Sequence, residues 1–173
     1  MGLDDKTGGS FSGQFQLGGR TCKISVTGFQ YVRNNYKAVS RSSKYSDISE
    51  VLRSSFLCNK ACDMRAVIGG LKPSTSYRIK TTHHSTAYDG GRLSLEYQGL
   101  ESIAPVTLQE SKNGEKPNPP LTHEQILKSG KDGLITLQFK NLGSSATNHA
   151  NLNALEIEEI PDKTGSGGDG ELY

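Results

Sequence analysis

The residues best suited to binding chemistry lie in a polar segment that directly follows a predicted strand. The segment contains His83, His84, Tyr88 and Asp89. A sugar ring presents a flat C–H face and several hydroxyls, and side chains of these types supply an apolar surface and hydrogen-bonding groups. In the alternative interpretation, His83 faces inward with its hydrogen bonds satisfied and Tyr88 is an ordinary turn residue. Adjacent histidines on a strand face opposite ways, so no metal site is expected.

A second polar segment covers residues 144–153 and is rich in side-chain amides. Asn148, His149 and Asn151 can bond the vicinal hydroxyls of a sugar. Asparagine also serves turn geometry by bonding its own backbone, which is the alternative interpretation. The two segments form one site only if the fold brings them to the same rim.

Aromatic and basic residues are interleaved along residues 31–45. Candidates for an anionic ligand there are Arg33, Tyr36, Lys37 and Arg41. Such a stretch can bind sulfated or uronic glycans or single-stranded nucleic acid, and it can equally be a solvated basic face. The isoelectric point of about 8.4 is only mildly basic. Because no RNP-type or zinc signature occurs either, nucleic acid is not expected as a partner.

The three cysteines are Cys22, Cys58 and Cys62. A disulfide between Cys58 and Cys62 and a bridge from Cys22 to either of them both fit the sequence, and each would contribute about 2–4 kcal/mol. Three buried thiols are the alternative. No second Cys or His pair at ligand spacing accompanies the C-x-x-x-C, so zinc is not expected.

The elements that position these residues are predicted to be strands. The chain has 173 residues, 20 of them glycine, and its 33% hydrophobic content favours one domain of many short strands. Residues 13–17 and 21–28 alternate in polarity and form a predicted hairpin around Gly18 and Gly19. Further strands are predicted at residues 64–71, 77–83, 93–97, 105–108, 133–142 and 151–160.

Two short helices are also predicted. Within residues 46–56, apolar side chains recur at helical spacing after Ser46, which is a suitable N-cap. Thr122 and Gln125 form a T-x-x-Q capping box for a turn or two of helix. Residues 1–160 are expected to form one domain, followed by a flexible, glycine-rich tail at 161–173.

The stretch LKPSTSY at residues 71–77 resembles the corner of fibronectin type III and other sandwich domains, where the Tyr hydroxyl satisfies backbone groups at the turn. The order that follows is IKTTHHS, GGRLSLEYQG, GLITLQF and NLNALEI, and it resembles the malectin-like and galactose-binding-like jelly rolls. The resemblance covers roughly residues 65–160. It implies an all-β jelly-roll sandwich that binds carbohydrate and belongs to a secreted or cell-surface protein. Malectin-type sites use loop aromatics and an acid, whereas this chain has no Trp.

No nucleophile-elbow, zincin or P-loop motif occurs, so the chain is expected to bind rather than catalyse, without a cofactor. The expected ligand is a glycan, neutral or anionic. The alternative is a structural or adhesive sandwich, like a fibronectin type III unit, with a protein partner and an exposed apolar patch or edge strand. No apolar run approaches the roughly 20 residues of a membrane span. The start, MGLDDKTGGS, also lacks the pattern of a signal peptide.

Overall fold

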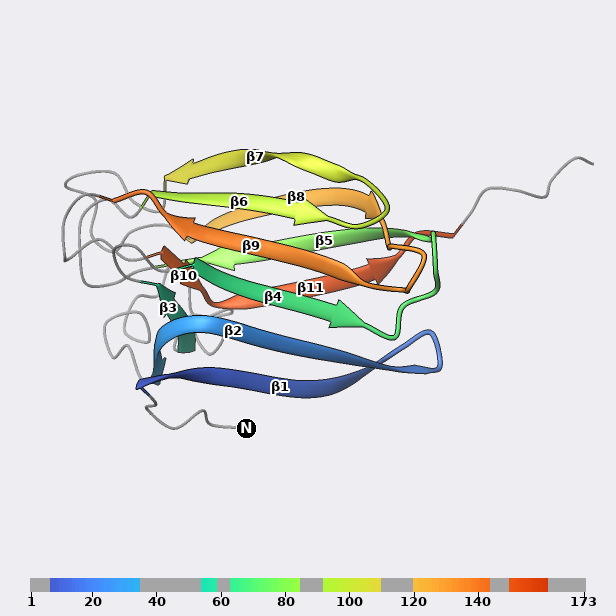
Figure 1. Cartoon of the computed structure of the whole chain (residues 1–173), viewed down its shortest axis with the longest axis horizontal. Helices are drawn as coiled ribbons and strands as arrows, with labels where there is room; N and C mark the ends of the chain where they lie inside the picture. The colour runs from blue at the N-terminus through green and yellow to red at the C-terminus, as the bar shows by residue number, and fades with distance from the viewer. Residues whose placement is uncertain are drawn as a thin grey trace, which may run out of the picture.

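The computed structural model describes residues 7–34, 54–58, 63–84, 92–109, 120–143 and 150–161. These residues form antiparallel strands and the turns between them (Figure 1). The strands are β1 (Thr7–Leu17), β2 (Arg20–Asn34), β3 (Ser54–Cys58), β4 (Asp63–Gly69), β5 (Ser76–His83), β6 (Arg92–Gln98), β7 (Ser102–Gln109), β8 (Leu121–Lys128), β9 (Ile135–Asn141), β10 (Ala150–Leu152) and β11 (Ala154–Glu159).

The strands form two layers, as expected for a β-sandwich. The larger sheet has eight strands in the order β10-β3-β2-β4-β9-β6-β7, with β1 paired to β2 outside this path. The smaller sheet has three strands in the order β11-β5-β8. Figure 1 shows the larger sheet in front of the smaller one. The predicted all-β sandwich is therefore confirmed.

The core lies between the two sheets and follows the predicted alternation of side chains. In β2, Cys22 and Val26 are buried whereas Lys23 between them is exposed. In β5, the buried side chains include Tyr77 and Ile79. Because successive side chains point to opposite faces of a strand, β4, β6 and β9 of the larger sheet alternate between buried inner side chains and more accessible outer ones.

The corner before β5 forms as the sequence predicts. The Tyr77 hydroxyl accepts a hydrogen bond of 2.9 Å from the backbone N–H of Lys72. The carbonyl of Lys72 in turn accepts a hydrogen bond from the Ser129 hydroxyl. These bonds attach the turn before β5 to the turn after β8, so they fix the end of the β5–β8 pair at which Ser76 lies opposite Lys128.

The helix predicted from the capping box at Thr122 and Gln125 is wrong, since both residues belong to β8. β8 pairs with β5 along its whole length, from Leu121 opposite His83 to Lys128 opposite Ser76. This long-range pairing satisfies the backbone of β8 more completely than a single helical turn can, so tertiary pairing overrides the local capping signal.

The helix predicted at residues 46–56 is wrong at its end, because Ser54, Ser55 and Phe56 belong to β3. Residues 46–53 lie outside the described residues. The Phe56 ring packs against the rings of Phe29 and Phe11, with centroid distances of 4.9 and 5.5 Å. Phe56 fits the helical spacing of the sequence, but in the structure it belongs to a strand and packs against aromatic rings of the neighbouring strands. In the described part of the chain, no helix has the length and hydropathy needed to cross a membrane.

Glycine is required where β2 passes from one neighbour to the next. Residues 23–27 of β2 pair with β4, and residues 31–34 pair with β3. Between them, Gly28 has a φ of 74°, and a Cβ there would lie 2.1 Å from the carbonyl oxygen of Asp63. A larger residue would clash with the β4 backbone, so this glycine allows the bend that lets one strand serve two partners.

Candidate functional site

The two predicted histidines lie inside the sandwich. His83 and His84 are both fully buried. The Nδ1 of His83 is 2.5 Å from the carbonyl oxygen of Asn151, and its Nε2 is 2.8 Å from the hydroxyl of Thr81. Since a carbonyl only accepts, Nδ1 carries the proton and Nε2 accepts from Thr81. Burial lowers the pKa of His83 to about 4, which keeps the ring neutral.

The two predicted polar segments meet at one end of the sandwich. Besides the contact between His83 and Asn151, the backbone N–H of His84 donates a 2.8 Å hydrogen bond to Oδ1 of Asn153. Asn151 is itself fully buried. The remaining candidates lie outside the described residues: Tyr88, Asp89, Asn148 and His149. The structure thus joins the start of the first segment to the end of the second.

The other predicted sites fall mostly outside the described residues. Arg33 belongs to β2, opposite Ser55 of β3. Tyr36, Lys37 and Arg41 are not described. Among the cysteines, Cys58 is disulfide-bonded and Cys22 is a buried free thiol, so a bridge from Cys22 is wrong. Cys62 lies outside the described residues, and its pairing with Cys58 stays a prediction.

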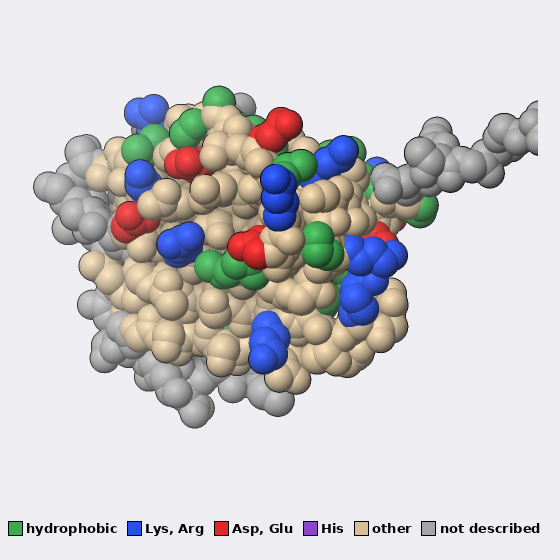
Figure 2. Space-filling view, turned by 45° about the vertical axis from the view of Figure 1, so that its right-hand side comes forward, with side chains coloured by type: hydrophobic (Ala, Val, Ile, Leu, Met, Phe, Trp, Pro, Cys, Tyr) green, Lys and Arg blue, Asp and Glu red, His purple; other side chains and the backbone are tan. Residues whose placement is uncertain are grey.

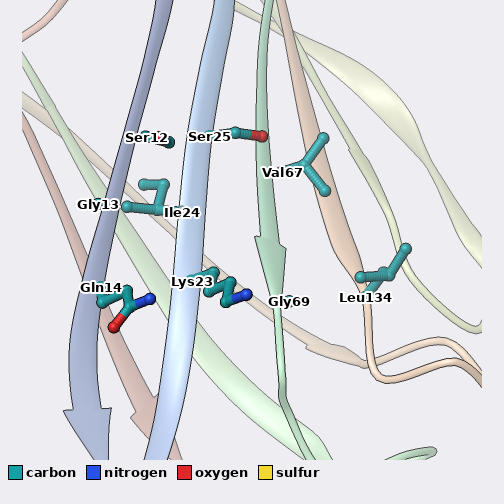
Figure 3. Close-up of a pocket in the computed structure, with 9 residues that line it drawn as sticks. All are labelled: Ser12, Gly13, Gln14, Lys23, Ile24, Ser25, Val67, Gly69 and Leu134. Atoms are coloured by element: carbon teal, nitrogen blue, oxygen red, sulfur yellow. The ribbon is translucent and has the colours of Figure 1, made fainter.

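A hollow on the outer face of the eight-stranded sheet lies over β1, β2 and β4. This first hollow has a volume of about 520 Å³. Its polar lining comes from Ser12, Gln14, Lys23 and Ser25. Figure 3 shows the Gln14 amide and the Lys23 amine on neighbouring strands. The first hollow therefore offers hydroxyl, amide and ammonium groups over an open surface.

Apolar side chains border the same hollow. Val67 of β4 and Leu134, which directly precedes β9, line it on the side away from β1 (Figure 3). Gly69 opposite Lys23 has no side chain to fill the space between them. Aliphatic carbon next to hydroxyl and amide groups is the surface chemistry that suits a sugar, whose ring has both a C–H face and hydroxyls.

Lys23 is the charged residue of this lining. Among the residues that the structure describes, no carboxylate lies within ion-pair distance of its amine. On the side of the molecule in Figure 2, basic and acidic side chains are interspersed over the strands and do not form one patch of a single sign. The charge of Lys23 is therefore available to a ligand.

A second hollow of about 140 Å³ lies farther across the same face. It is lined by Arg65, Glu96, Gln98, Thr136 and Gln138, which come from β4, β6 and β9. The Gln138 amide donates to the Asp63 carboxylate over 2.9 Å, which orients that amide. The described residues contain no group of three or more His, Cys, Asp or Glu side chains that could hold a metal ion.

The sequence reasoning missed the outer face, although the signal was present in the alternation. Lys23, Ser25 and Thr27 point opposite to the buried residues of β2 and were recognisable as an outward face. The sequence alone did not show that β1 and β4 pair with β2 and that β9 pairs with β4, which places the outer sides of these strands on one surface. Without the order of the strands, four short polar stretches could not be assigned to one surface.

No family model matches the chain, and no curated protein matches its sequence. Among solved structures, it is similar to the extracellular domain of ANXUR2 from Arabidopsis thaliana, with a TM-score of 0.55 and 12% identity over 81% of this chain and 41% of that one. The extracellular domain of ANXUR1 from the same plant gives a TM-score of 0.52 and 11% identity, over 75% of this chain and 38% of that one. TmCBM61, solved in complex with β-1,4-galactotriose, gives a TM-score of 0.42 and 13% identity, over 75% of this chain and 87% of that one.

This chain spans less than half the length of either ANXUR extracellular domain. Identities this low establish a likeness of fold. The chain thus shares its β-sandwich fold with the two ANXUR extracellular domains.

Proposed function

We propose that this chain is a non-catalytic carbohydrate-binding domain of a secreted or cell-surface protein. The observation that carries the proposal is the first hollow, in which Ser12, Gln14, Lys23 and Ser25 stand beside the aliphatic Val67. Hydroxyl and amide groups can exchange hydrogen bonds with sugar hydroxyls, and the aliphatic surface can cover part of a C–H face. The hollow is open and shallow, which suits a ligand that is recognised and released unchanged.

Two observations support a location outside the cytoplasm. Cys58 is disulfide-bonded, and disulfides persist in oxidising compartments such as the extracellular space. The solved structures with the same fold include two extracellular domains. A secreted or surface-exposed domain with this fold would meet polysaccharides of cell walls or matrices.

We further propose that the glycan carries some negative charge. Lys23 supplies a cation within the first hollow, and a uronic carboxylate or a sulfate placed there would form a charge-assisted hydrogen bond. The polar segments with Tyr88, Asp89, Asn148 and His149 stay a second predicted contact region. Support for that region is the adjacency of His83 and Asn151, from which the two segments depart.

A protein partner is the alternative function, and one observation favours it. Leu100 and Ile126 are 39% and 50% exposed, and both line a hollow of about 330 Å³ beside β8. An exposed aliphatic pair at the edge of a sheet is a common feature of protein contacts. Glycan retention distinguishes the two functions, since a purely protein-binding domain would not be retained by any polysaccharide.

The test is affinity electrophoresis and glycan-array binding of the whole chain, with Ser25→Trp as the blocking variant. An indole at position 25 would fill the first hollow, and aromatic residues are well tolerated in strands. Retention on at least one polysaccharide is expected, and Ser25→Trp should weaken it by about tenfold or more, the equivalent of about 1.4 kcal/mol. Thr122→Trp, on the exposed face of β8 in the other sheet, is the matched control.

Absence of retention on every neutral and acidic polysaccharide would refute the proposed function. Binding that Ser25→Trp and Thr122→Trp leave equally intact would refute the first hollow as the binding site, because glycan would then be bound elsewhere. The melting temperature of both variants establishes that each is folded.

A further inference from the structure

The two hollows on the outer face of the eight-stranded sheet belong to one row of side chains. Strand register places Ser12 opposite Ser25, and Ser25 opposite Val67. Val67 is opposite Thr136, which is opposite Gln98. We call these five residues the outer-face row. Its first three members line the first hollow and its last two line the second.

The outer-face row is straight because each member is the direct cross-strand partner of the next. It runs across β1, β2, β4, β9 and β6, perpendicular to the strands. Neighbouring strands lie about 4.8 Å apart, so four spacings give a row of roughly 19 Å. That length exceeds a single sugar ring several times over.

The composition of the row also suits a chain of linked sugars. Hydroxyls or an amide stand at Ser12, Ser25, Thr136 and Gln98, with the aliphatic Val67 at the centre. A flanking row, one pleat along, adds Arg65, Gln138 and Glu96, which are partners in the same register. Hydrogen-bonding groups therefore recur at each strand.

Both ends of the row are accessible. Ser12 and Gln98 are exposed, whereas Ser25, Val67 and Thr136 between them are partly buried. Because both ends of the row are exposed, a chain can pass over it from one side to the other. A pocket closed at one end would instead select the terminus of a chain.

We infer that the ligand is an extended polysaccharide, bound along an internal stretch that crosses the strands of the outer face. This inference rests on the proposed carbohydrate-binding function and specifies the form of its ligand. One part of the chain occupies the first hollow and a neighbouring part reaches Thr136 and Gln98 in the second.

The test compares short and long ligands with the same protein. The probes are cello-, xylo-, galacto- and galacturono-oligosaccharides, each as the disaccharide and the hexasaccharide, measured by isothermal titration calorimetry. A hexasaccharide that reaches the second hollow gains further hydrogen bonds there, so it should bind about tenfold more tightly than its disaccharide.

The variant Gln98→Ala separates the second hollow from the first. It should reduce hexasaccharide affinity about three- to tenfold and leave disaccharide affinity unchanged, because the disaccharide occupies the first hollow alone. Gln125→Ala on β8 removes the same side chain from the other sheet and should change neither affinity.

The outcomes distinguish the inference from the proposed function. If a disaccharide and its hexasaccharide bind equally well, or if Gln98→Ala changes both affinities alike, the extended site is refuted while carbohydrate binding stands. If neither length binds and the parent polysaccharides also fail to retain the protein, the proposed function itself is refuted.

Discussion

Hydrogen-bonding side chains gather in two regions of this sandwich, and the two regions differ in what their groups face. Around His83, the groups face one another inside the core: His83 contacts Thr81 and Asn151, and the Tyr97 hydroxyl lies 2.8 Å from Nδ1 of His123. Along the outer-face row, similar groups face solvent over five strands. The first arrangement stabilises the fold, whereas the second leaves its hydrogen-bonding capacity available to a ligand.

The difference follows from the strand face that each residue occupies. Thr81 and His83 lie on the inner face of β5, where burial without a partner would cost free energy, so each has a protein partner. Ser25 lies on the outer face of β2, where water satisfies it until a ligand replaces the water. The same chemical group is thus structural on one face and a binding group on the other.

Substitution of His83 by alanine tests the structural half of this comparison and should have the largest effect. The change removes a buried ring and the two hydrogen bonds that the ring makes with the Asn151 carbonyl and the Thr81 hydroxyl. We expect a loss of about 3 kcal/mol in the free energy of unfolding, measured by urea denaturation.

A second measurement on His83→Ala separates structure from binding. At urea concentrations below its denaturation midpoint, the folded part of the variant should bind polysaccharide as the unmodified protein does. The reason is that the His83 ring is fully buried and is not exposed to a ligand. A variant with unchanged stability and lost glycan binding would reverse the comparison and make His83 a ligand-binding residue.

The pH dependence of stability sharpens the same comparison. The pKa of His83 is about 4 in the folded state, below its usual 6.5, because burial disfavours the charged ring. The unfolded state therefore binds more protons below pH 6.5, and stability falls as the pH falls from 6.5 toward 4. Protonation would also place a proton on Nε2, where the Thr81 hydroxyl now donates.

From these values the loss between pH 7.5 and pH 5 is about 2 kcal/mol, since one pKa unit corresponds to about 1.4 kcal/mol. Urea midpoints at the two pH values measure it. His83→Gln keeps a polar side chain but does not titrate, so its stability should change distinctly less over the same interval. An equal change in both proteins would show that other groups cause the pH dependence.

The fold was predictable where a local pattern is repeated by the tertiary structure. The alternation in residues 21–28 and 77–83 predicted the inward faces of β2 and β5, and the LKPSTSY corner predicted the bond from Lys72 to Tyr77. Prediction failed where local and long-range preferences compete. The capping box at Thr122 is a genuine helix signal, but eight residues of pairing with β5 outweigh it.

The candidate site was less predictable than the fold, because it depends on strand order. Ser12, Ser25 and Thr136 are unremarkable residues in three separate strands. Only the register of β1, β2, β4 and β9 makes them neighbours, and nothing in the local sequence encodes that β9 pairs with β4. The histidine pair was a candidate because imidazole can bond sugar hydroxyls, yet His83 bonds Thr81 and Asn151 inside the core instead.

The variant Lys23→Gln tests the binding half of the comparison and should have the smallest effect. Lys23 is exposed, so its attraction to an anionic sugar is weakened by water and salt. We expect about a threefold loss of affinity for oligogalacturonate at low ionic strength and no loss for a neutral oligosaccharide. Lys128→Gln, on β8 of the other sheet, is the matched control.

Salt dependence completes this test, because an electrostatic contribution must fade as ions screen it. In low salt the unmodified protein should prefer oligogalacturonate over the neutral ligand, and the preference should disappear near 1 M salt, where the screening length is about 3 Å. Lys23→Gln should show the high-salt behaviour at every ionic strength. If it loses affinity for neutral and acidic ligands alike, Lys23 acts as a hydrogen-bond donor to sugar hydroxyls, and the outer face recognises shape and hydroxyl pattern without regard to charge.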